Sequence, residues 1–309
     1  MMPYSDRRYL SAKKTVDDRA LNKDVVERLR SELASSRSTS LRVLEVGAGL
    51  GTMVARLVDW NILRNAEYVF LDVDGDLLAA SRDWLATWAA PRGHVVEARS
   101  DGLRIHGATA DITITCIRAE VGEYLQREAG ILPVDLLIAN AFFDLVDVKQ
   151  LLPQLFRLVA PAGLYWFSIN YDGETIFQPE HPDDEMLMQV YHRSIDERVR
   201  YGRPAGDRNT GRHLFHHLLG AGATVLAAGA SDWVVHGSDA RYEADEEYFL
   251  HHIIHFIDQE LQRQGKVDQH ILARWVALRH EQARRGELIY VAHQLDFVGR
   301  RDPRDKGAS

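Results

Sequence analysis

The chain has 309 residues, of which 46% are hydrophobic, and it carries a formal net charge of −8. This length exceeds one average domain and falls short of two full ones, so we expect one large domain with insertions. Nucleic-acid binding depends on clustered cations, and the negative charge argues against it.

The cysteine content and the N-terminal sequence bear on the compartment. Cys116 is the only cysteine, which excludes a disulfide within the chain and a zinc site made of several thiolates. Residues 1–20 are charged throughout, and no stretch of 18 residues is apolar and free of charge. We therefore expect a cytoplasmic protein that makes no membrane contact.

Predicted helices and strands alternate through the first half of the chain. Residues 1–40 form an N-terminal helical segment, with apolar side chains at helical spacing over 21–34 and a polar linker over 35–40. Strands are then predicted at 41–46, 68–73, 111–117, 134–140 and 164–170, with helices at 51–60, 76–89, 120–129 and 148–159. This alternation indicates parallel strands with right-handed crossovers, and hence a doubly wound α/β sheet. Ligands of such sheets bind at the carboxyl ends of the strands.

The second half resumes this pattern after an interruption. It predicts a helix at 212–222, a strand at 224–230, a long helical stretch at 243–285 and a last strand at 287–298. We take residues 41–298 as one domain with helical insertions at 172–208 and 236–286, which we expect to form lids or substrate walls. We expect the tail, 299–309, to be disordered.

A glycine-rich turn, LEVGAGLGTM at 44–53, follows the first predicted strand. Glycine adopts a positive φ at low cost and leaves space free of Cβ for a ligand, which explains Gly47, Gly49 and Gly51. A dinucleotide fingerprint, G-x-G-x-x-G, would have its third glycine where this chain has Thr52, and the phosphate loop G-x-x-x-x-G-K-[ST] is absent. Both phosphate-binding interpretations are therefore weakened.

The segment Glu45-Val-Gly47-Ala-Gly49-Leu-Gly51 resembles the acidic-x-G-x-G-x-G signature of class I S-adenosylmethionine-dependent methyltransferases. That family also has an acid at the end of its second strand, matched here by Asp72, and an acid after its third strand, for which Glu120 is the candidate. The resemblance implies a Rossmann-like methyltransferase fold with S-adenosylmethionine as cofactor. In that fold seven mostly parallel strands form the sheet, and the last strand is antiparallel and lies between the fifth and sixth.

The resemblance also implies which residues bind the cofactor: Glu45, Gly47, Ala48, Gly49, Gly51, Asp72, Val73, Glu120 and Asn140. The Asp72 carboxylate can accept hydrogen bonds from both ribose hydroxyls. A sulfonium ligand without phosphates suits the acidic neighbourhood around Glu45. N-terminal segments of this family often fold over the cofactor, so the segment containing Tyr9, Lys13, Lys14, Arg19 and Asn22 is either a lid or a solvated helix start.

Methyl transfer depends mainly on aligning the nucleophile with the methyl carbon and sulfur, and a base is needed only if the acceptor must lose a proton. Asn140, Phe143 and Asp144 at the end of the fourth strand are candidates for the substrate side, with core packing as the alternative for Phe142 and Phe143. The (D/N)-P-P-Y motif of amino-group methyltransferases is absent here, which argues against a planar exocyclic amine as acceptor.

Other strand ends supply further candidates. Asn170 and Tyr171, followed by Asp172, are substrate candidates after the fifth strand, and Asp232, Trp233 and Asp296 lie near later strand ends. His293 on the last strand is a candidate general base because its ordinary pKa lies near neutrality, and Asp144 is the other catalytic candidate. The pairs His213/His217 and His251/His255 have chelating spacing, but no adjacent carboxylate completes a ligand set, so we expect no metal.

The sequence thus predicts an S-adenosylmethionine-dependent methyltransferase that acts on a small-molecule acceptor. The alternatives are an NAD-dependent oxidoreductase on a similar sheet, a non-catalytic S-adenosylmethionine-binding protein, and an enzyme that transfers another group from a related sulfonium. Neither the acceptor atom nor the oligomeric state is indicated by the sequence.

Overall fold

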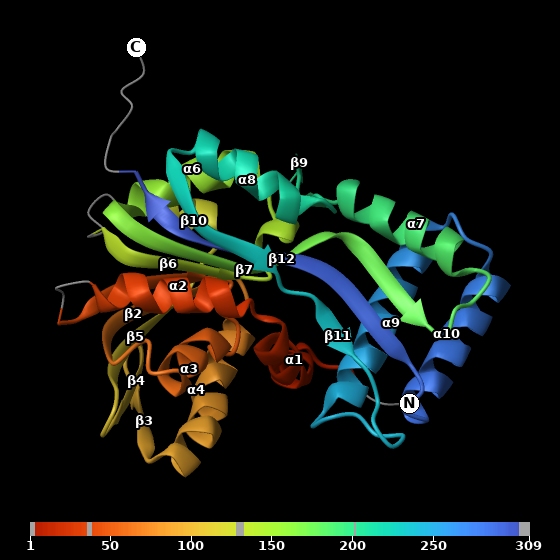
Figure 1. The fold of residues 1–309 in the computed structure, drawn as a ribbon, viewed down its shortest axis with the longest axis horizontal. Coiled ribbons are helices and arrows are strands. Elements are labelled where there is room, and N and C mark those ends of the chain that lie inside the picture. Colours follow the sequence, from red (N-terminus) through yellow and green to blue (C-terminus); the bar gives the residue numbers. More distant parts are fainter. Residues whose placement is uncertain (1–3, 36–38, 128–132, 201, 303–309) are drawn as a thin grey trace.

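A single sheet with helices on both faces forms the centre of the protein (Figure 1). The structure, a computed structural model, describes residues 4–35, 39–127, 133–200 and 202–302. The predicted linker at 35–40, the predicted helix at 120–129 and the expected disordered tail fall partly outside these residues.

The main sheet contains ten strands: β1 (Leu41–Val46), β2 (Asn65–Asp72), β3 (His94–Arg99), β4 (Gly102–Gly107), β5 (Asp111–Arg118), β6 (Val134–Asn140), β7 (Val159–Gln178), β10 (Ala223–Ala230), β11 (Trp233–Val235) and β12 (Ile289–Arg301). A separate two-stranded pair is formed by β8 (Val199–Arg200) and β9 (Arg203–Pro204). The helices are α1 (Asp6–Ala20), α2 (Lys23–Ala34), α3 (Thr52–Asp59), α4 (Gly75–Ala89), α5 (Val121–Arg127), α6 (Val148–Leu158), α7 (Asp184–Asp196), α8 (Thr210–Gly220), α9 (Glu246–Gln264) and α10 (Gln269–Arg284).

The strand order confirms the predicted fold class. The sheet runs β10-β12-β7-β6-β1-β2-β5-β4-β3, and neighbours from β5 through β2, β1 and β6 to β7 are parallel. The last strand, β12, lies between β7 and β10 and is antiparallel to both. The seven expected strands are therefore present in the order that the resemblance implies, including the inserted antiparallel strand.

Three strands of the sheet were not predicted. β3 and β4 form an antiparallel hairpin that extends the sheet beyond β5, and β11 pairs with β12. The hairpin lies at an edge and its outer strand β3 is largely exposed, so its sequence lacks the apolar run of a buried strand. β12 is also longer than predicted, because Arg300 and Arg301 pair with β10, and residues 299–301 are strand rather than disordered tail.

Side chains alternate between the two faces of the sheet, as expected of strands. In β1, Val43 packs into one hydrophobic cluster with residues of α2, α3 and α4, while Leu44 packs into a second cluster with residues of α5, α6 and α8. Figure 1 shows α2, α3 and α4 on one side of the sheet and α6 and α8 on the other. Both faces are therefore covered, and ligands are left with the carboxyl edge of the strands.

The N-terminal segment contains two helices, where the sequence predicted one. α1 begins after Ser5, whose side chain accepts a hydrogen bond from Arg8, and Asn22 caps α2 through the backbone N–H groups of Asp24 and Val25. The apolar pattern of α1 is weak because its buried side chains include Lys13 and Asp17. α1 packs against α9 and β11 (Figure 1).

The two predicted insertions contain a strand extension, the β8–β9 pair and three helices. β7 continues to Gln178 before α7 begins, so the first residues of the segment 172–208 still belong to the sheet. The long helical stretch predicted at 243–285 is two helices, because Gly265 ends α9 with a φ of 62° and Asp268 caps α10. Within the described part of the chain, no helix has the length and apolar character needed to span a membrane.

Candidate ligand-binding site

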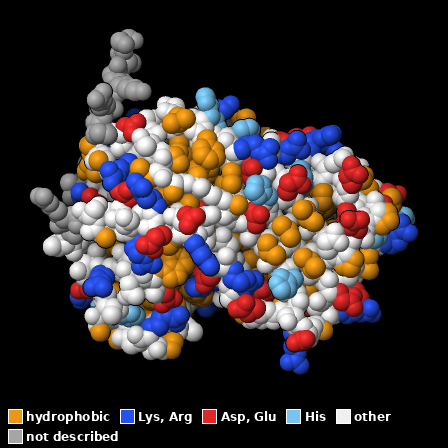
Figure 2. Space-filling view, viewed as in Figure 1, with side chains coloured by type: hydrophobic (Ala, Val, Ile, Leu, Met, Phe, Trp, Pro, Cys, Tyr) orange, Lys and Arg blue, Asp and Glu red, His pale blue; other side chains and the backbone are white. Residues whose placement is uncertain are grey.

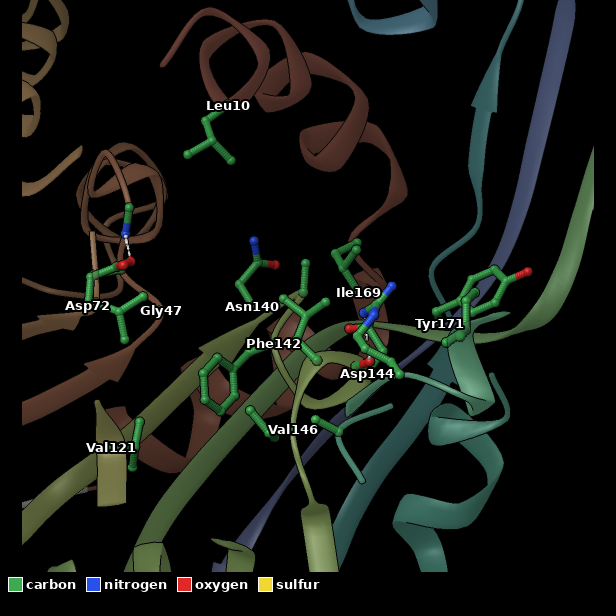
Figure 3. A pocket seen from close by; sticks show the side chains of 18 of the residues that line it. Leu10, Gly47, Asp72, Val121, Asn140, Phe142, Asp144, Val146, Ile169 and Tyr171 are labelled. Atoms are coloured by element: carbon green, nitrogen blue, oxygen red, sulfur yellow. Dashed lines mark hydrogen bonds between the residues drawn. The ribbon is translucent and has the colours of Figure 1, made fainter. Parts of the chain in front are cut away.

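A cavity of about 1050 Å³ lies at the carboxyl ends of β1, β2, β6 and β7. One half is lined by the glycine turn after β1, by the end of β2 and by the start of α5. The other half is lined by residues of β7, β12, α7 and α9, and α1 contributes four side chains between the two halves: Tyr9, Leu10, Lys13 and Asp17. Figure 3 shows Leu10 of α1 facing Asp72 and Asn140 across the cavity.

The glycine turn has the backbone conformation for which glycine is required. Gly47, Gly49 and Gly51 have φ values of 69°, 52° and 76°, in the left-handed region that other residues adopt only with strain. A Cβ at Gly47 would lie 2.9 Å from the Phe142 ring, and one at Gly49 would lie 3.2 Å from a Leu10 methyl group. Both positions line the cavity, as does Ala48, so the turn offers a ligand bare backbone.

Gly51 has a different function from the other two glycines. It precedes α3 and is not among the residues that line the cavity. A Cβ at this position would lie 2.6 Å from the Phe70 ring on β2. Gly51 therefore allows close packing of the turn on the sheet, and its contribution to ligand binding is indirect.

Asp72 joins the end of β2 to the glycine turn. Its Oδ2 accepts a hydrogen bond of 2.8 Å from the Gly49 N–H (Figure 3), and its Oδ1 accepts one of 2.9 Å from the Asp74 N–H. Burial raises the pKa of the carboxyl, and these backbone donors oppose the increase. A carboxylate has more acceptor positions than these two N–H groups use, so Asp72 can also accept from a ligand.

Glu45 lies below the turn and is almost inaccessible to solvent, although it lines the cavity. The Tyr68 hydroxyl donates a 2.7 Å hydrogen bond to its Oε2. Burial raises the pKa of Glu45 to about 8, against the opposing effects of the Tyr68 hydrogen bond and the Arg56 charge. A nearby positive charge would favour the ionised form of this carboxyl.

The remaining predicted cofactor residues also lie along this half of the cavity. Val73 follows Asp72 and is half exposed, and Glu120 is an exposed carboxylate just after β5. Asn140 ends β6, where its Oδ1 accepts a 2.8 Å hydrogen bond from the Ser168 hydroxyl and its Nδ2 lies 3.5 Å from Asp17. The structure thus brings Glu45, Asp72, Glu120 and Asn140 to one cavity.

The other half of the cavity is rich in aromatic side chains. It is lined by Tyr9, Tyr171, Tyr191 and Tyr290, and burial raises the pKa of each phenol. Of the predicted substrate residues, Tyr171 lines this half and hydrogen-bonds Thr175 at 2.9 Å. The catalytic candidate Asp144 also lines it, from the short 3₁₀ helix Phe143–Leu145.

Three other candidates do not line the cavity. Phe143 is fully buried against Phe167, in agreement with the core-packing alternative, whereas its neighbour Phe142 faces the cavity. Asn170 is fully buried and donates to the Leu295 carbonyl at 2.8 Å. His293 points to the opposite face of β12, because alternate residues of a strand face opposite sides and its neighbours Ala292 and Gln294 line the cavity.

His293 instead belongs to a group of charged side chains outside the cavity. Its Nδ1 lies 2.8 Å from Asp232, and its Nε2 lies 3.6 Å from Asp172, which also pairs with Arg212 at 2.9 Å. These two carboxylates lie at opposite nitrogens of the ring. His293 therefore has structural partners and no path to a ligand in this cavity.

The histidine pairs that have chelating spacing have separate partners. His213 lies 2.6 Å from Asp207, His251 lies 2.7 Å from His280, and the His255 ring stacks on Tyr4. In the described ranges, no three His, Cys, Asp or Glu side chains are arranged to hold a metal ion.

The sequence did not reveal the buried charges that α1 brings to the cavity as a connected group. Lys13 and Asp17 form an ion pair of 2.5 Å, and Asp17 also accepts from the Trp233 indole N–H at 2.9 Å. The sequence carries one signal of this arrangement, the spacing of four residues between two lysines and two aspartates in KKTVDD. Spacing alone does not show which of the two pairs is buried.

Comparisons with known proteins give structural matches only. No protein-family model matches the chain, and no curated protein sequence matches it. Solved structures that superpose on it include a geranyl diphosphate C-methyltransferase from Streptomyces coelicolor, with 10% identity, a TM-score of 0.43, and coverage of 89% of this chain and 78% of that chain. A protein from Galdieria sulphuraria described as a sarcosine dimethylglycine methyltransferase has 15% identity and a TM-score of 0.42, covering 90% of this chain and 84% of that chain.

A third match is phosphoethanolamine N-methyltransferase 2 from Haemonchus contortus, with 11% identity, a TM-score of 0.41, and coverage of 91% of this chain and 52% of that chain. Similarity at this level supports no conclusion about ligand or reaction.

Proposed function

We propose that this protein is an S-adenosylmethionine-dependent methyltransferase that acts on a small molecule. One observation carries the proposal: the glycine turn, Asp72 and Glu120 line a single cavity, in a sheet whose last strand is antiparallel and inserted next to the fifth parallel strand, β7. The glycine signature, the two acids and the strand order are independent features of the resemblance, and they meet at one place in the fold.

The residues around the turn fit this cofactor. Asp72 would accept hydrogen bonds from the ribose hydroxyls, Glu120 would hold the adenine amino group, and the backbone of Gly47, Ala48 and Gly49 would hold the rest of the ligand. The acidic side chains suit a ligand that carries a sulfonium and an ammonium group. When bound, S-adenosylmethionine supplies an activated methyl group, and the chain's own residues hold the ligand and exclude water.

The glycine spacing argues against the NAD alternative, because Thr52 stands where the third glycine is expected, whereas Asp72 would suit the ribose of either ligand. A pyrophosphate favours a helix N-terminus with cations or free N–H groups around it. Here the cavity wall near the turn carries the carboxyl groups of Asp72 and Glu120, and Glu45, whose pKa burial raises to about 8, lies beside them. Of the residues that the structure describes, three with cationic side chains line the cavity. Arg198, just after α7, and Arg263 in α9 lie in the half away from the turn, and Lys13 of α1 lies between the two halves.

The acceptor is proposed to occupy the aromatic half of the cavity. A volume of about 1050 Å³ is at the upper end of the range for sites that bind one drug-sized ligand, so a small acceptor has room beside the cofactor. Tyr171, Tyr191 and Tyr290 supply aromatic surface there, and residues of α9 also line this half. For an acceptor that must lose a proton, we propose Asp144, which lines this half of the cavity, as the general base.

The interior position of this site favours a small acceptor over a polymer. On the face shown in Figure 2, Lys and Arg side chains are interspersed with Asp and Glu and form no continuous basic stripe. We propose a cytoplasmic enzyme that binds neither nucleic acid nor membranes.

Methyl-labelled S-adenosylmethionine tests this function. The purified protein is incubated with the labelled cofactor in three separate reactions, which contain a panel of small metabolites, RNA or a protein extract. We expect label in a small molecule and an equal amount of S-adenosylhomocysteine, both reduced in Asp72→Ala. Cofactor binding without S-adenosylhomocysteine formation would favour the non-catalytic alternative, and label in RNA or protein would contradict the small acceptor.

A further inference from the structure

α1 places a buried pair of opposite charges in the wall of the cavity. Lys13 and Asp17 line the cavity, and only 5% and 2% of their respective surface areas are exposed to solvent. Burying a charge is costly unless partners compensate for the lost water. The hydrogen-bond partners of each side chain therefore show what the pair can offer to a ligand.

The Asp17 carboxylate has its acceptor positions filled by the protein. Its Oδ2 lies 2.5 Å from the Lys13 ammonium and 3.3 Å from the Arg56 guanidinium, and its Oδ1 accepts the Trp233 indole N–H at 2.9 Å. The Asn140 amide approaches at 3.5 Å. Asp17 thus fixes the position of its neighbours and is itself in no need of a ligand.

Lys13 is in the opposite situation. An ammonium group has three N–H donors, and among the described residues only Asp17 accepts from it. Its Nζ also lies 5.1 Å from the centre of the Trp233 ring, which holds it against the cavity wall. Burial lowers the pKa of Lys13, and the Asp17 carboxylate opposes this effect. Because Lys13 lines the cavity, its two remaining donors are available to a ligand that enters the cavity.

The sheet order shows which part of a ligand reaches Lys13. From β2, which carries Asp72, the strand ends lead to β1 with the glycine turn and then to β6 with Asn140, which approaches Asp17. Two strand spacings amount to about 10 Å. A nucleoside held at Asp72 that extends an amino-acid tail over the turn therefore brings the tail to Asn140 and the α1 pair.

We propose that Lys13 binds the carboxylate of the cofactor's amino-acid tail, and that Asp17 is the positioning residue that holds the Lys13 ammonium in place. This inference rests on the proposed function, because it concerns the same ligand. It assigns α1 a direct contact with the cofactor: the helix closes over the tail through an ion pair formed only when the ligand is present.

The chain offers a matched control on the same helix. Lys14 forms an ion pair of 2.5 Å with Asp18, with the same spacing of four residues as Lys13 and Asp17. Lys14 does not line the cavity. Lys14→Met therefore removes a lysine of the same kind from the same turn of the helix without touching the proposed contact.

The experiment measures binding of three ligands to the full chain by titration calorimetry. S-adenosylhomocysteine has the complete tail, its decarboxylated analogue keeps the amine and lacks the carboxylate, and 5′-methylthioadenosine lacks both. We expect Lys13→Met to weaken S-adenosylhomocysteine binding by about 10- to 100-fold, the loss of a charge-assisted hydrogen bond. The other two ligands should bind this variant as they bind the wild type, and Lys14→Met and Lys13→Arg should retain the wild-type preference.

Each outcome decides the inference separately from the proposed function. Equal losses for all three ligands in Lys13→Met would show a structural role for Lys13 and overturn the proposal, as would unchanged S-adenosylhomocysteine binding. Because methylthioadenosine binding reports an intact nucleoside site, a misfolded variant is recognised at once. If none of the three ligands binds the wild-type protein, the proposed function fails instead.

Discussion

The contact between Asp72 and the ribose can be tested by removing each partner in turn. Asp72→Ala removes the carboxylate, and 2′,3′-dideoxyadenosine lacks the two hydroxyls that adenosine presents. The carboxylate already accepts the Gly49 and Asp74 N–H groups, at 2.8 and 2.9 Å, so its orientation is fixed before the ligand binds. A preorganised, charged acceptor contributes about 1–3 kcal/mol through such hydrogen bonds.

We therefore expect wild-type protein to bind adenosine about 5- to 100-fold more tightly than the dideoxy analogue. Asp72→Ala should bind both ligands with the weaker affinity, because removing either partner of a contact makes removal of the other neutral. Competition against labelled S-adenosylhomocysteine gives the four affinities, and a thermal melt checks that the variant is folded. A variant that still prefers adenosine to the same extent would refute the ribose assignment.

Three further substitutions test other parts of the site. Since burial raises the pKa of Glu45 to about 8 from an ordinary value of 4.5, the free energy of unfolding should fall as pH rises between these values. Glu45→Gln should remove this dependence of the unfolding free energy on pH. Above pH 8 the variant should be more stable than wild type by more than about 1 kcal/mol in urea denaturation. Parallel pH profiles of variant and wild type would contradict the raised pKa of Glu45. Gly49→Ala should cost about 1–3 kcal/mol of stability, because Gly49 has a φ of 52°, and it should weaken cofactor binding. The control, Gly220→Ala, has open space around the added Cβ and an ordinary φ, so it should change neither stability nor binding. Asp296→Ala should destabilise the fold by about 2–4 kcal/mol, because the buried carboxylate accepts hydrogen bonds of 2.8 and 2.7 Å from the Asn22 and Ile169 N–H groups. Limited proteolysis of this variant should cleave faster between α1 and α2. An unchanged proteolysis rate would show that Asp296 does not hold this junction.

The cofactor half of the site could be predicted because its chemistry is local in sequence. A turn that needs three left-handed residues shows glycine at three positions, and an acid at the end of a buried strand interrupts an apolar run. Gly47, Gly49 and Asp72 follow directly from these patterns, and parallel strands bring them to one edge of the sheet. Glu120 and Asn140 follow from the same rule at other strand ends.

The residues between the two halves could not be predicted with equal certainty, because their roles depend on packing between distant segments. Lys13 and Asp17 face the cavity only because α1 packs on α9 and β11. Trp233 of β11, which hydrogen-bonds Asp17, lies 216 residues further along the chain. His293 was a reasonable candidate from its residue type, but the phase of alternation in β12 turns it away from the cavity.

The most direct test of the central claim is a calorimetric titration of the wild-type protein with S-adenosylhomocysteine and, in parallel, with NAD. We expect saturable binding of one S-adenosylhomocysteine per chain and no binding of NAD. Binding of NAD without binding of S-adenosylhomocysteine, or binding of neither, would contradict it.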